Sequence, residues 1–373
     1  MNSLEVRKKT ITNIHESEFK FVIVSSGGGS NAIGSLLKVP GASNSILEAY
    51  IPYAKESLDF YLMKKPESYC SLDTTTRMAA RAYSAAKKID QKTNIEQLFG
   101  VAISATLSTN YKKKGSHRFH IAVQTRDFSQ SISCILNKGQ RTREEEEELV
   151  TEFVIALISD CCGFEFKYPK IKEDVEHIQI PAQKGWADLM SEKIKFVTSS
   201  NQQPKLIFPG AFNPMHDGHI AMSELANKEL SEEVFFEICI QNVDKPPLSY
   251  HQIKKTIDQF TDSKNWVLTK AGKFSDKAKL FPNSTFIIGA DTLVRIFDER
   301  FYASRREMME EFEIFNANNN NFLVFGREYK NKFIELNDIQ VPDSIKSRFR
   351  GFGENIFRKD VSSSTIRAQN SEE

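Results

Sequence analysis

Cysteines are few in this sequence, and no long apolar segment is present. The five cysteines, Cys70, Cys134, Cys161, Cys162 and Cys239, are scattered, and no C-x-x-C pair occurs. This pattern argues against both a disulfide framework and a zinc site. No apolar run approaches the ~18 residues of a transmembrane helix, and the N-terminus MNSLEVRKKTITNIHES lacks the apolar core of a signal peptide. We therefore expect a reducing compartment, the cytoplasm or the nucleus, and no membrane partner.

The chain also lacks an excess of charge of either sign. Its 50 Lys and Arg residues balance 49 Asp and Glu residues, for a formal net charge of +1. Such a balance creates no global field that attracts nucleic acid, so we expect small-molecule partners instead. With 373 residues, of which 40% are hydrophobic, the chain is long enough for two globular domains, or three at most.

The apolar pattern indicates two α/β domains joined by a polar connector. The segment FKFVIVSS (19–26) is typical of a buried strand, and RTREEEEELVTEFVIALISDCCG (141–163) of a long helix with acids in its first turns. Residues 166–204 are polar and carry prolines, which predicts a linker. Strands then alternate with helical stretches, which implies a parallel sheet with helices on both faces. We predict an α/β fold with domains over 1–165 and 205–373, each a mainly parallel sheet flanked by helices.

The stretch GAFNPMHDGHI (210–220) follows a short apolar strand and opens a predicted helix. Gly210 permits a tight turn, and Gly218 leaves room for a ligand beside the start of the helix. His216 and His219 lie on one face of the first turn, where unpaired backbone N–H groups favour anions. Ligands of open parallel sheets bind at this edge. The pattern indicates a site for a nucleoside triphosphate, with an ordinary solvated histidine pair as the alternative.

A second stretch, VSSSTIR (361–367), has three hydroxyl residues in a row before a predicted helix. They are typical of a helix N-cap with spare donors, and Arg367 can bind phosphate oxygens in a bidentate manner. Hydroxyl-rich stretches are common near a C-terminus, as solvated histidine pairs are at helix starts. Together, on an α/β pattern, the two stretches favour a phosphate site.

Both stretches resemble signatures of one superfamily. GAFNPMHDGH matches the G-x-F-x-P-x-H-x-G-H signature of the HxGH nucleotidyltransferases, and VSSSTIR resembles their I-S-S-T-x-x-R signature. FIIGADTL (286–293) is similar to a strand end of nicotinamide or nicotinate mononucleotide adenylyltransferases. The resemblance covers about residues 205–370 and implies a Rossmann-like nucleotidyltransferase fold. Two departures are Ser364, where the family usually has threonine, and the segment FDERFY, which lacks the tryptophan common in that subfamily.

The resemblance implies that AMP is transferred from ATP to a mononucleotide, such as nicotinamide or nicotinate mononucleotide, with release of pyrophosphate. It implies no metal bound by the protein itself, and Mg²⁺ carried by the triphosphate. His216 and His219 would hold the phosphates and stabilise the transition state. Arg367 is the third catalytic residue that the resemblance implies. The residues implied for nucleotide binding are Gly210, Phe212, Gly218, Lys245, Asp291, Ser363 and Ser364. The same site also suits a cytidylyltransferase or an NTP hydrolase, and a non-catalytic nucleotide sensor is a third alternative.

In the first domain, VIVSSGGGSNAIG (22–34) also places glycines between a strand and a helix, but it fits neither common phosphate-loop template. The wider sequence, over about residues 18–160, resembles the nicotinamide-nucleotide amidase domain of the CinA (competence-damage-inducible) family. That resemblance places Ser26 on the nucleophilic serine and Tyr53 on a family tyrosine. Together the two resemblances imply a role in NAD biosynthesis.

The amidase resemblance is weakest at the catalytic positions. The family's catalytic lysine falls on Leu58, the nearest lysine is Lys55, and SATLSTNYKKKG (104–115) replaces a glycine-rich segment. Because a serine needs an adjacent base to attack an amide, we expect a ligand-binding or regulatory domain rather than a working amidase. The candidate site there consists of Ser26, Gly28, Gly29, Tyr53 and Lys55. A basic cluster, for which a phosphate site and a solvated hairpin are equal interpretations, consists of Lys112, Lys113, Lys114, His117 and Arg118.

The sequence leaves open whether the chain forms a homo-oligomer. It also leaves open which triphosphate and which acceptor the site takes.

Overall fold

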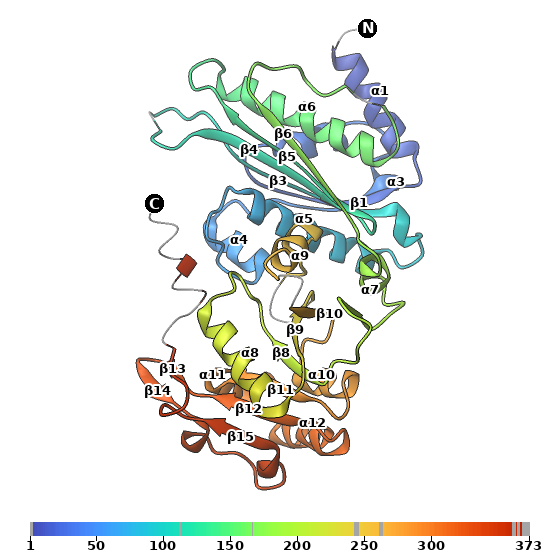
Figure 1. Ribbon diagram of the computed structural model, residues 1–373. Coiled ribbons are helices and arrows are strands. Elements are labelled where there is room, and N and C mark those ends of the chain that lie inside the picture. Colours follow the sequence, from blue (N-terminus) through green and yellow to red (C-terminus); the bar gives the residue numbers. More distant parts are fainter. Residues whose placement is uncertain are drawn as a thin grey trace. The chain divides into compact units, whose positions relative to one another are not determined.

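The fold is known from a computed structural model (Figure 1). The structure describes residues 3–111, 113–165, 167–241, 246–260, 264–359, 363, 366 and 367. Two compact units make up the chain: unit 1 comprises Met1–Ser191 and Val243–Lys254, and unit 2 comprises Glu192–Asn242 and Lys255–Glu373. Within the described residues, every helix is too short or too polar to cross a membrane.

Unit 1 contains a six-stranded sheet of order β2-β1-β3-β4-β5-β6. β1 pairs in parallel with β2 and β3, whereas the β3–β4, β4–β5 and β5–β6 pairs are antiparallel. The sheet is therefore mixed, and the expectation of a mainly parallel sheet is wrong for this unit. No helix separates β3, β4 and β5 in the chain, so direct turns force neighbouring strands to run antiparallel. The strands are β1 (Lys20–Gly27), β2 (Ile46–Tyr50), β3 (Leu98–Thr106), β4 (His117–Gln124), β5 (Phe128–Leu136) and β6 (Val175–Pro181).

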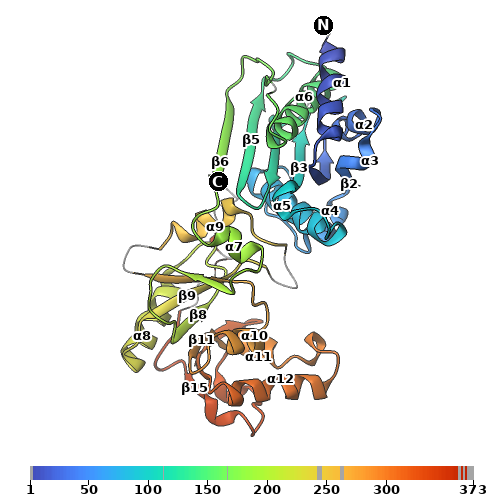
Figure 2. The same ribbon diagram turned by 90° about the vertical axis from the view of Figure 1, so that its right-hand side faces the viewer.

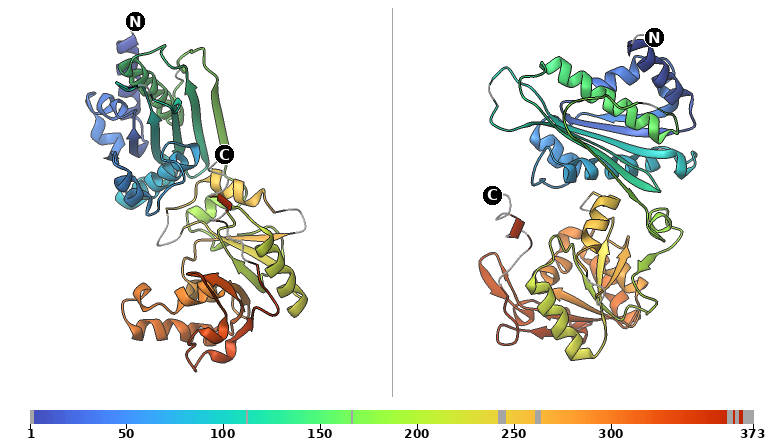
Figure 3. Two further views of the ribbon diagram at one scale, coloured as in Figure 1. Left: turned by 90° about the vertical axis from the view of Figure 1, so that its left-hand side faces the viewer. Right: turned by 45° about the horizontal axis from the view of Figure 1, so that its top comes forward.

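Helices cover both faces of this sheet (Figures 1 and 3). Phe21 and Ile23 of β1 belong to the core beneath α6, while the alternate residues Val22 and Val24 pack toward α4 and α5. The helices are α1 (Ser3–Glu16), α2 (Asn31–Leu37), α3 (Ala42–Ser45), α4 (Lys55–Leu62), α5 (Leu72–Ile89), α6 (Arg143–Cys161) and α7 (Trp186–Met190). The predicted helix over 141–163 is confirmed as α6, which begins with a capping box.

The segment 166–204, predicted to be a linker, instead supplies structure to both units. Its strand β6 extends the sheet of unit 1, and α7 also belongs to that unit. Further along, β7 (Phe196–Thr198) joins the sheet of unit 2. The chain enters unit 2 at Glu192, before the predicted start of the second domain at residue 205, and unit 1 extends beyond residue 165. β6 escaped notice because it lies at a sheet edge, where about half of its side chains are exposed and polar.

A second chain segment, Val243–Lys254, also belongs to unit 1. Its Tyr250, at the start of α9 (Tyr250–Ile257), is fully buried and stacks on Trp186 with ring centroids 5.6 Å apart. The Tyr250 N–H donates to the Ser129 hydroxyl at 3.0 Å. Gln252 donates from Nε2 to the Thr76 hydroxyl at 2.6 Å. Unit 1 is thus completed by residues that lie far beyond its other segment in the chain.

Unit 2 contains a seven-stranded sheet of order β15-β12-β11-β8-β9-β10-β7, parallel except for β7. The predicted parallel sheet is confirmed here. Chain order reverses at β8, because β9 and β10 follow on one side and β11 and β12 on the other. Such a reversal marks the ligand-binding edge of an open sheet. The strands are β8 (Leu206–Pro209), β9 (Val234–Cys239), β10 (Asn265–Thr269), β11 (Thr285–Gly289), β12 (Asn321–Phe325) and β15 (Phe349–Phe352), with a separate hairpin of β13 (Arg327–Tyr329) and β14 (Lys332–Ile334).

Helices again lie on both faces of the sheet in unit 2. Figure 2 shows α8 (Asp217–Leu230) on one face and α10 (Phe274–Leu280), α11 (Ala290–Ile296) and α12 (Arg305–Ala317) on the other. Phe286 and Phe312 belong to the core on the second face. Phe208 and Phe236 stack with each other on the first face, beside the residues that follow β8.

An ion pair is buried in unit 2 between Glu237 on β9 and Lys277 on α10. Their residues are 1% and 4% exposed, and Lys277 Nζ lies 2.8 Å from both carboxylate oxygens of Glu237. Lys277 also donates to the carbonyl of Ala271 at 2.6 Å. Each of the two charges is stabilised by the other, because no water reaches either side chain to solvate it.

Replacing Lys277 by methionine should destabilise unit 2 by about 3–5 kcal/mol, because the Glu237 carboxylate is left buried and unpaired. The two tryptophans of the chain, Trp186 in unit 1 and Trp266 in unit 2, allow the units to be followed separately. We would measure urea unfolding of Lys277→Met by Trp266 fluorescence in a Trp186→Phe background.

The matched control is Lys279→Met, because Lys279 is exposed on the same helix. We expect it to change the free energy of unfolding by less than about 0.5 kcal/mol. Equal effects of the two substitutions would contradict the proposed dependence of Glu237 on Lys277.

Candidate functional site

The residues between β8 and α8, Gly210–His216, form what we call the histidine loop. It leaves the carboxyl end of the central strand, at the point where chain order reverses. The Gly210 N–H donates to the Glu237 carbonyl at 3.0 Å, which fixes the start of the loop to β9. The loop therefore occupies the position predicted for it.

Phe212 anchors the middle of the histidine loop. It is 1% exposed, and its ring lies within 5.1–5.8 Å of the rings of His219, Phe236, Phe208 and Phe260, centroid to centroid. Its φ of 43° is costly for a residue other than glycine, and aromatic burial offsets that cost.

Gly210 is required by the same ring. A Cβ at residue 210 would lie 2.5 Å from Phe212 Cζ, so a larger residue there would displace the aromatic ring. Gly210 and Phe212, both predicted as nucleotide-binding residues, thus set the path of the loop.

Gln259 clamps the histidine loop through its amide group. Its Nε2 donates to the Phe212 carbonyl at 2.8 Å, and its Oε1 accepts from the Met215 N–H, also at 2.8 Å. Gln259 was not among the predicted residues, because nothing in the sequence distinguishes a glutamine that binds a distant loop from any other glutamine just after a helix.

The two histidines stack at the first turn of α8. His216 is the N-cap residue, and its ring lies 3.7 Å from that of His219, centroid to centroid, with 25° between the planes. The His216 N–H donates to His219 Nδ1 at 3.3 Å, so a neutral His219 carries its proton on Nε2. Both ring nitrogens of His216 are buried and have no hydrogen-bond partner among the described residues. A built Cβ at Gly218 would lie 3.0 Å from the His216 ring, so glycine leaves the ring its space.

Burial keeps both imidazoles neutral. It lowers the pKa of His216, and together with His216 and Arg327 it lowers the pKa of His219 to about 3. A neutral imidazole can donate one N–H to a phosphate oxygen, and the negative charge of that phosphate would raise the pKa of the ring.

Arg327, on β13, supplies a positive charge to the site and was missed by the sequence analysis. Its Nη1 lies 4.0 Å from Oδ1 of Asp291, in the first turn of α11. Asp291 Oδ1 is buried without a hydrogen bond from any described residue. A built Cβ at Gly289 would lie 2.4 Å from that oxygen, which explains the glycine. The only sequence signal for Arg327 is its place just after a strand of the parallel sheet.

The C-terminal motif contacts the histidine loop through two side chains. The Ser363 hydroxyl donates to the Pro214 carbonyl at 2.9 Å, and Arg367 Nη1 donates to the Asn213 carbonyl. These contacts join residues about 150 positions apart in the chain. Ser364 and Lys245, also predicted for this site, lie outside the described residues.

In unit 1, the residues predicted for an amidase-like site do not assemble into a catalytic group. The Ser26 hydroxyl donates to the Pro52 carbonyl at 3.0 Å. Tyr53 is 69% exposed, and Lys55 Nζ lies over the Tyr69 ring, 5.5 Å from its centroid. Among the described residues, no basic side chain is hydrogen-bonded to Ser26.

The glycines that follow Ser26 are explained by packing. A Cβ at Gly28 would lie 2.5 Å from Leu107 Cδ1, and one at Gly29 would lie 2.5 Å from Ile103 Cγ2. The Gly29 N–H donates to Glu147 Oε2 at 2.8 Å. Because the Glu147 carboxylate already accepts a hydrogen bond from the Gly29 N–H, this N–H is not available to bind a phosphate.

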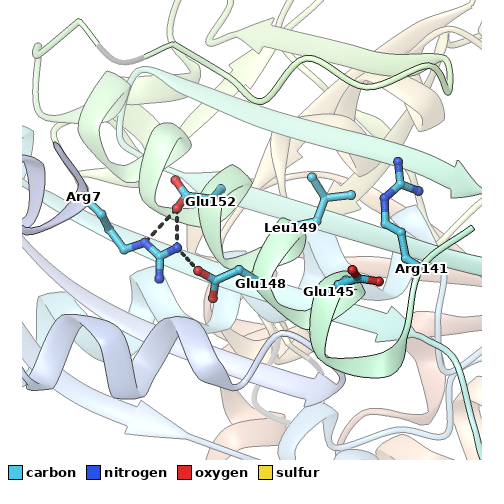
Figure 4. A pocket seen from close by; sticks show the side chains of 6 residues that line it. All are labelled: Arg7, Arg141, Glu145, Glu148, Leu149 and Glu152. Carbon is cyan, nitrogen blue, oxygen red and sulfur yellow. Dashed lines mark hydrogen bonds and ion pairs between the residues drawn. The ribbon is translucent and has the colours of Figure 1, made fainter. Parts of the chain in front are cut away.

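A shallow pocket of about 330 Å³ lies along α6 (Figure 4). Arg7 points between Glu148 and Glu152 and is bonded to both, with 2.7 Å from Arg7 Nε to Glu152 Oε1. Arg141 binds Glu173 through two nitrogens, at 2.6 and 3.0 Å. Because both arginines are paired, the pocket offers little to a charged ligand. Within the described residues there is also no group of three or more His, Cys, Asp and Glu that could hold a metal ion.

Comparison with known proteins finds a family model that matches the C-terminal part of the chain. Residues 207–369, which include both motifs of the site, match the family model described as cytidylyltransferase-like. Unit 2 therefore carries a cytidylyltransferase-like nucleotidyltransferase domain. No curated protein matches the chain.

Solved structures similar to the chain include several competence-damage proteins. CihA from Agrobacterium tumefaciens is 16% identical, with a TM-score of 0.31 over 43% of this chain and 91% of that one. The Enterobacter asburiae protein is 14% identical, with a TM-score of 0.36 over 43% and 99% of the two chains. The CinA superfamily protein from Klebsiella pneumoniae is 13% identical, with a TM-score of 0.35 over 44% and 99%.

The stability of unit 2 should fall as the pH is lowered from about 7 to about 4. The pKa of His219 in the folded chain, about 3, is below its ordinary value of 6.5, so the unfolded chain takes up protons first as the pH falls. Urea unfolding followed by Trp266 fluorescence at several pH values measures this slope. His219→Gln should flatten it, and an unchanged slope would contradict the buried neutral state of His219.

Proposed function

We propose that the cytidylyltransferase-like domain of unit 2 transfers AMP from ATP to nicotinamide or nicotinate mononucleotide. The observation that carries this proposal is the buried His216 ring, stacked on His219 at the start of α8, with neither nitrogen bonded to a described residue. Such atoms are costly unless a ligand satisfies them. Phosphate oxygens at a helix N-terminus would do so.

The reaction needs positioning and charge stabilisation. An oxygen of the acceptor phosphate forms a bond to the α-phosphorus, the bond from that phosphorus to the bridging oxygen breaks, and pyrophosphate leaves. The acceptor is already an anion, so no general base is required. Neutral His216 and His219 donate to phosphate oxygens, and the Arg327 guanidinium offsets the charge that develops.

Ser363 and Arg367 act on this site by bracing the histidine loop. Their contacts with the Pro214 and Asn213 carbonyls keep the loop backbone in place from the C-terminal side. Mg²⁺ would enter with the triphosphate and supply charge neutralisation, since it keeps most of its waters and binds mainly through phosphates. Asp217, which acts electrostatically on His216, and Asp291, beside Arg327, are carboxylates of the kind that contact a largely hydrated Mg²⁺ ion.

His219→Ala should lower kcat about 10²–10³-fold, the usual cost of losing one preorganised donor. Pyrophosphate release would be measured for ATP and for CTP, each with nicotinamide mononucleotide, nicotinate mononucleotide and no acceptor. The matched control is His177→Ala, an exposed histidine of β6, which should leave the rate unchanged.

The combinations in this assay separate the alternatives. Acceptor-dependent release with ATP supports the adenylyltransferase, and release with CTP alone favours the cytidylyltransferase that the family model names. Phosphate release without acceptor would favour a hydrolase. Bound triphosphate without any turnover would contradict an enzyme and favour a sensor.

We further propose that unit 1 is not a working amidase. The Ser26 hydroxyl is bonded to a carbonyl, and no described basic group activates it. We expect no ammonia release from nicotinamide mononucleotide by the full chain, measured with a coupled assay. Ammonia release that disappears in Ser26→Ala would show this proposal to be wrong.

A further inference from the structure

One face of the unit 1 sheet becomes polar toward the carboxyl ends of β1 and β3. Directly paired residues of neighbouring strands share a face, and Ser26, Ser104, His120 and Ser133 form one such row across β1, β3, β4 and β5. Two residues earlier along β1 and β3, Val24 and Ala102 belong to the core against α4 and α5. The polar row therefore faces the same side as α5.

Hydroxyl and thiol groups close this polar region on the α5 side. Thr75 of α5 lies 2.7 Å from Ser104, oxygen to oxygen, and both residues are fully buried. The Ser104 hydroxyl donates to Cys70 Sγ at 3.7 Å. These contacts hold the polar region together on the α5 side.

Three basic side chains of this region, Lys113, Arg118 and His120, form no ion pair with a carboxylate within the described residues. Arg118 Nε and His120 Nε2 are buried, and neither has a hydrogen-bond partner among the described residues. Lys113 donates to the Thr106 hydroxyl, beside Arg118 in the strand register. Burial and Arg118 lower the pKa of His120 to about 4, and burial lowers that of Lys113, with Arg118 and Arg143 contributing. Lys113 and Arg118 are thus two positive charges close enough to lower the pKa of Lys113.

The nearest acid does not neutralise this group. Glu146 acts on Lys113 electrostatically, but its carboxylate accepts from the Ser108 N–H at 2.6 Å and lies 2.8 Å from His117 Nδ1. His117, placed in the basic cluster by sequence, is therefore engaged elsewhere. Lys114 is exposed, and Lys112 lies outside the described residues.

We propose that Lys113, Arg118 and His120 bind the phosphate group of a small anion, either inorganic phosphate or a phosphomonoester. The positive charges of Lys113 and Arg118 match the charge of about −1.5 to −2 on a phosphomonoester at neutral pH. His120 Nδ1 lies 2.8 Å from the Ser133 hydroxyl. If that hydroxyl donates, the neutral ring carries its proton on Nε2, where it can donate to the anion. A fully solvated hairpin would not leave these donor atoms buried and unpaired.

This site belongs to unit 1 and does not depend on the proposed transferase activity. The test uses the full chain labelled with ¹⁵N-histidine, in which His120 is assigned among the seven histidines with a His120→Gln variant. Inorganic phosphate and then a nucleoside 5′-monophosphate are titrated while the His120 resonances are recorded. We expect saturable shifts at His120 and a rise in its pKa on binding. A tighter response to one probe identifies the source of the phosphate group.

Arg118→Gln should weaken this response roughly 10–100-fold, the usual effect of losing a charge-assisted hydrogen bond. The matched control is Arg77→Gln, because Arg77 is already paired with Asp73 at 2.8 Å and should not alter binding. Unchanged His15 and His117 resonances report that unit 1 is folded in each variant.

The proposal is overturned if neither probe shifts His120 saturably, or if the response persists in Arg118→Gln. Phosphate that binds only at the histidine loop would move His216 and His219 instead. The failure of this site is therefore distinguishable from failure of the transferase proposal.

Discussion

Unit 2 buries two uncharged imidazoles, those of His216 and His219, at the carboxyl end of β8. The free-energy cost of this burial constrains the structure around them. His216 has no hydrogen bond from the described residues to offset its burial, and Arg327 opposes its protonation. The surrounding features maintain this state. Phe212 is held in a strained backbone conformation by aromatic packing, and the Gln259 amide ties both sides of the loop together. Packing and hydrogen bonds elsewhere in unit 2 thus hold the histidine loop in this strained conformation.

The same logic distinguishes the glycines of the two units. Gly218 and Gly289 make room for the groups of the site, the His216 ring and the Asp291 carboxylate. Gly28 and Gly29 make room for Leu107 and Ile103, and the N–H of Gly29 is bonded to Glu147. A glycine-rich turn between a strand and a helix therefore does not by itself predict a phosphate site. The atom that a Cβ would contact shows whether the glycine makes room for a group of the site or for a core side chain.

The histidine loop and its position in a parallel sheet could be predicted from sequence because they depend on local signals. Short apolar strands alternate with helices, and the motif lies in about ten consecutive residues. The roles of Gln259 and Arg327 could not be predicted, because they depend on contacts with residues that are distant in the sequence. β6 has no clear strand pattern in the sequence, because its edge position leaves much of it polar. The mixed sheet of unit 1 was not predicted, because strands joined by short turns were expected to be parallel, as strands joined by helices are.

The passage of Val243–Lys254 through unit 1 has a consequence for how this chain is made. A ribosome that has released only residues 1–191 has not yet supplied Tyr250, so Trp186 and Ser129 still lack their partner. Unit 1 is completed only after the first segment of unit 2, Glu192–Asn242, has been translated, which departs from the usual domain-by-domain order.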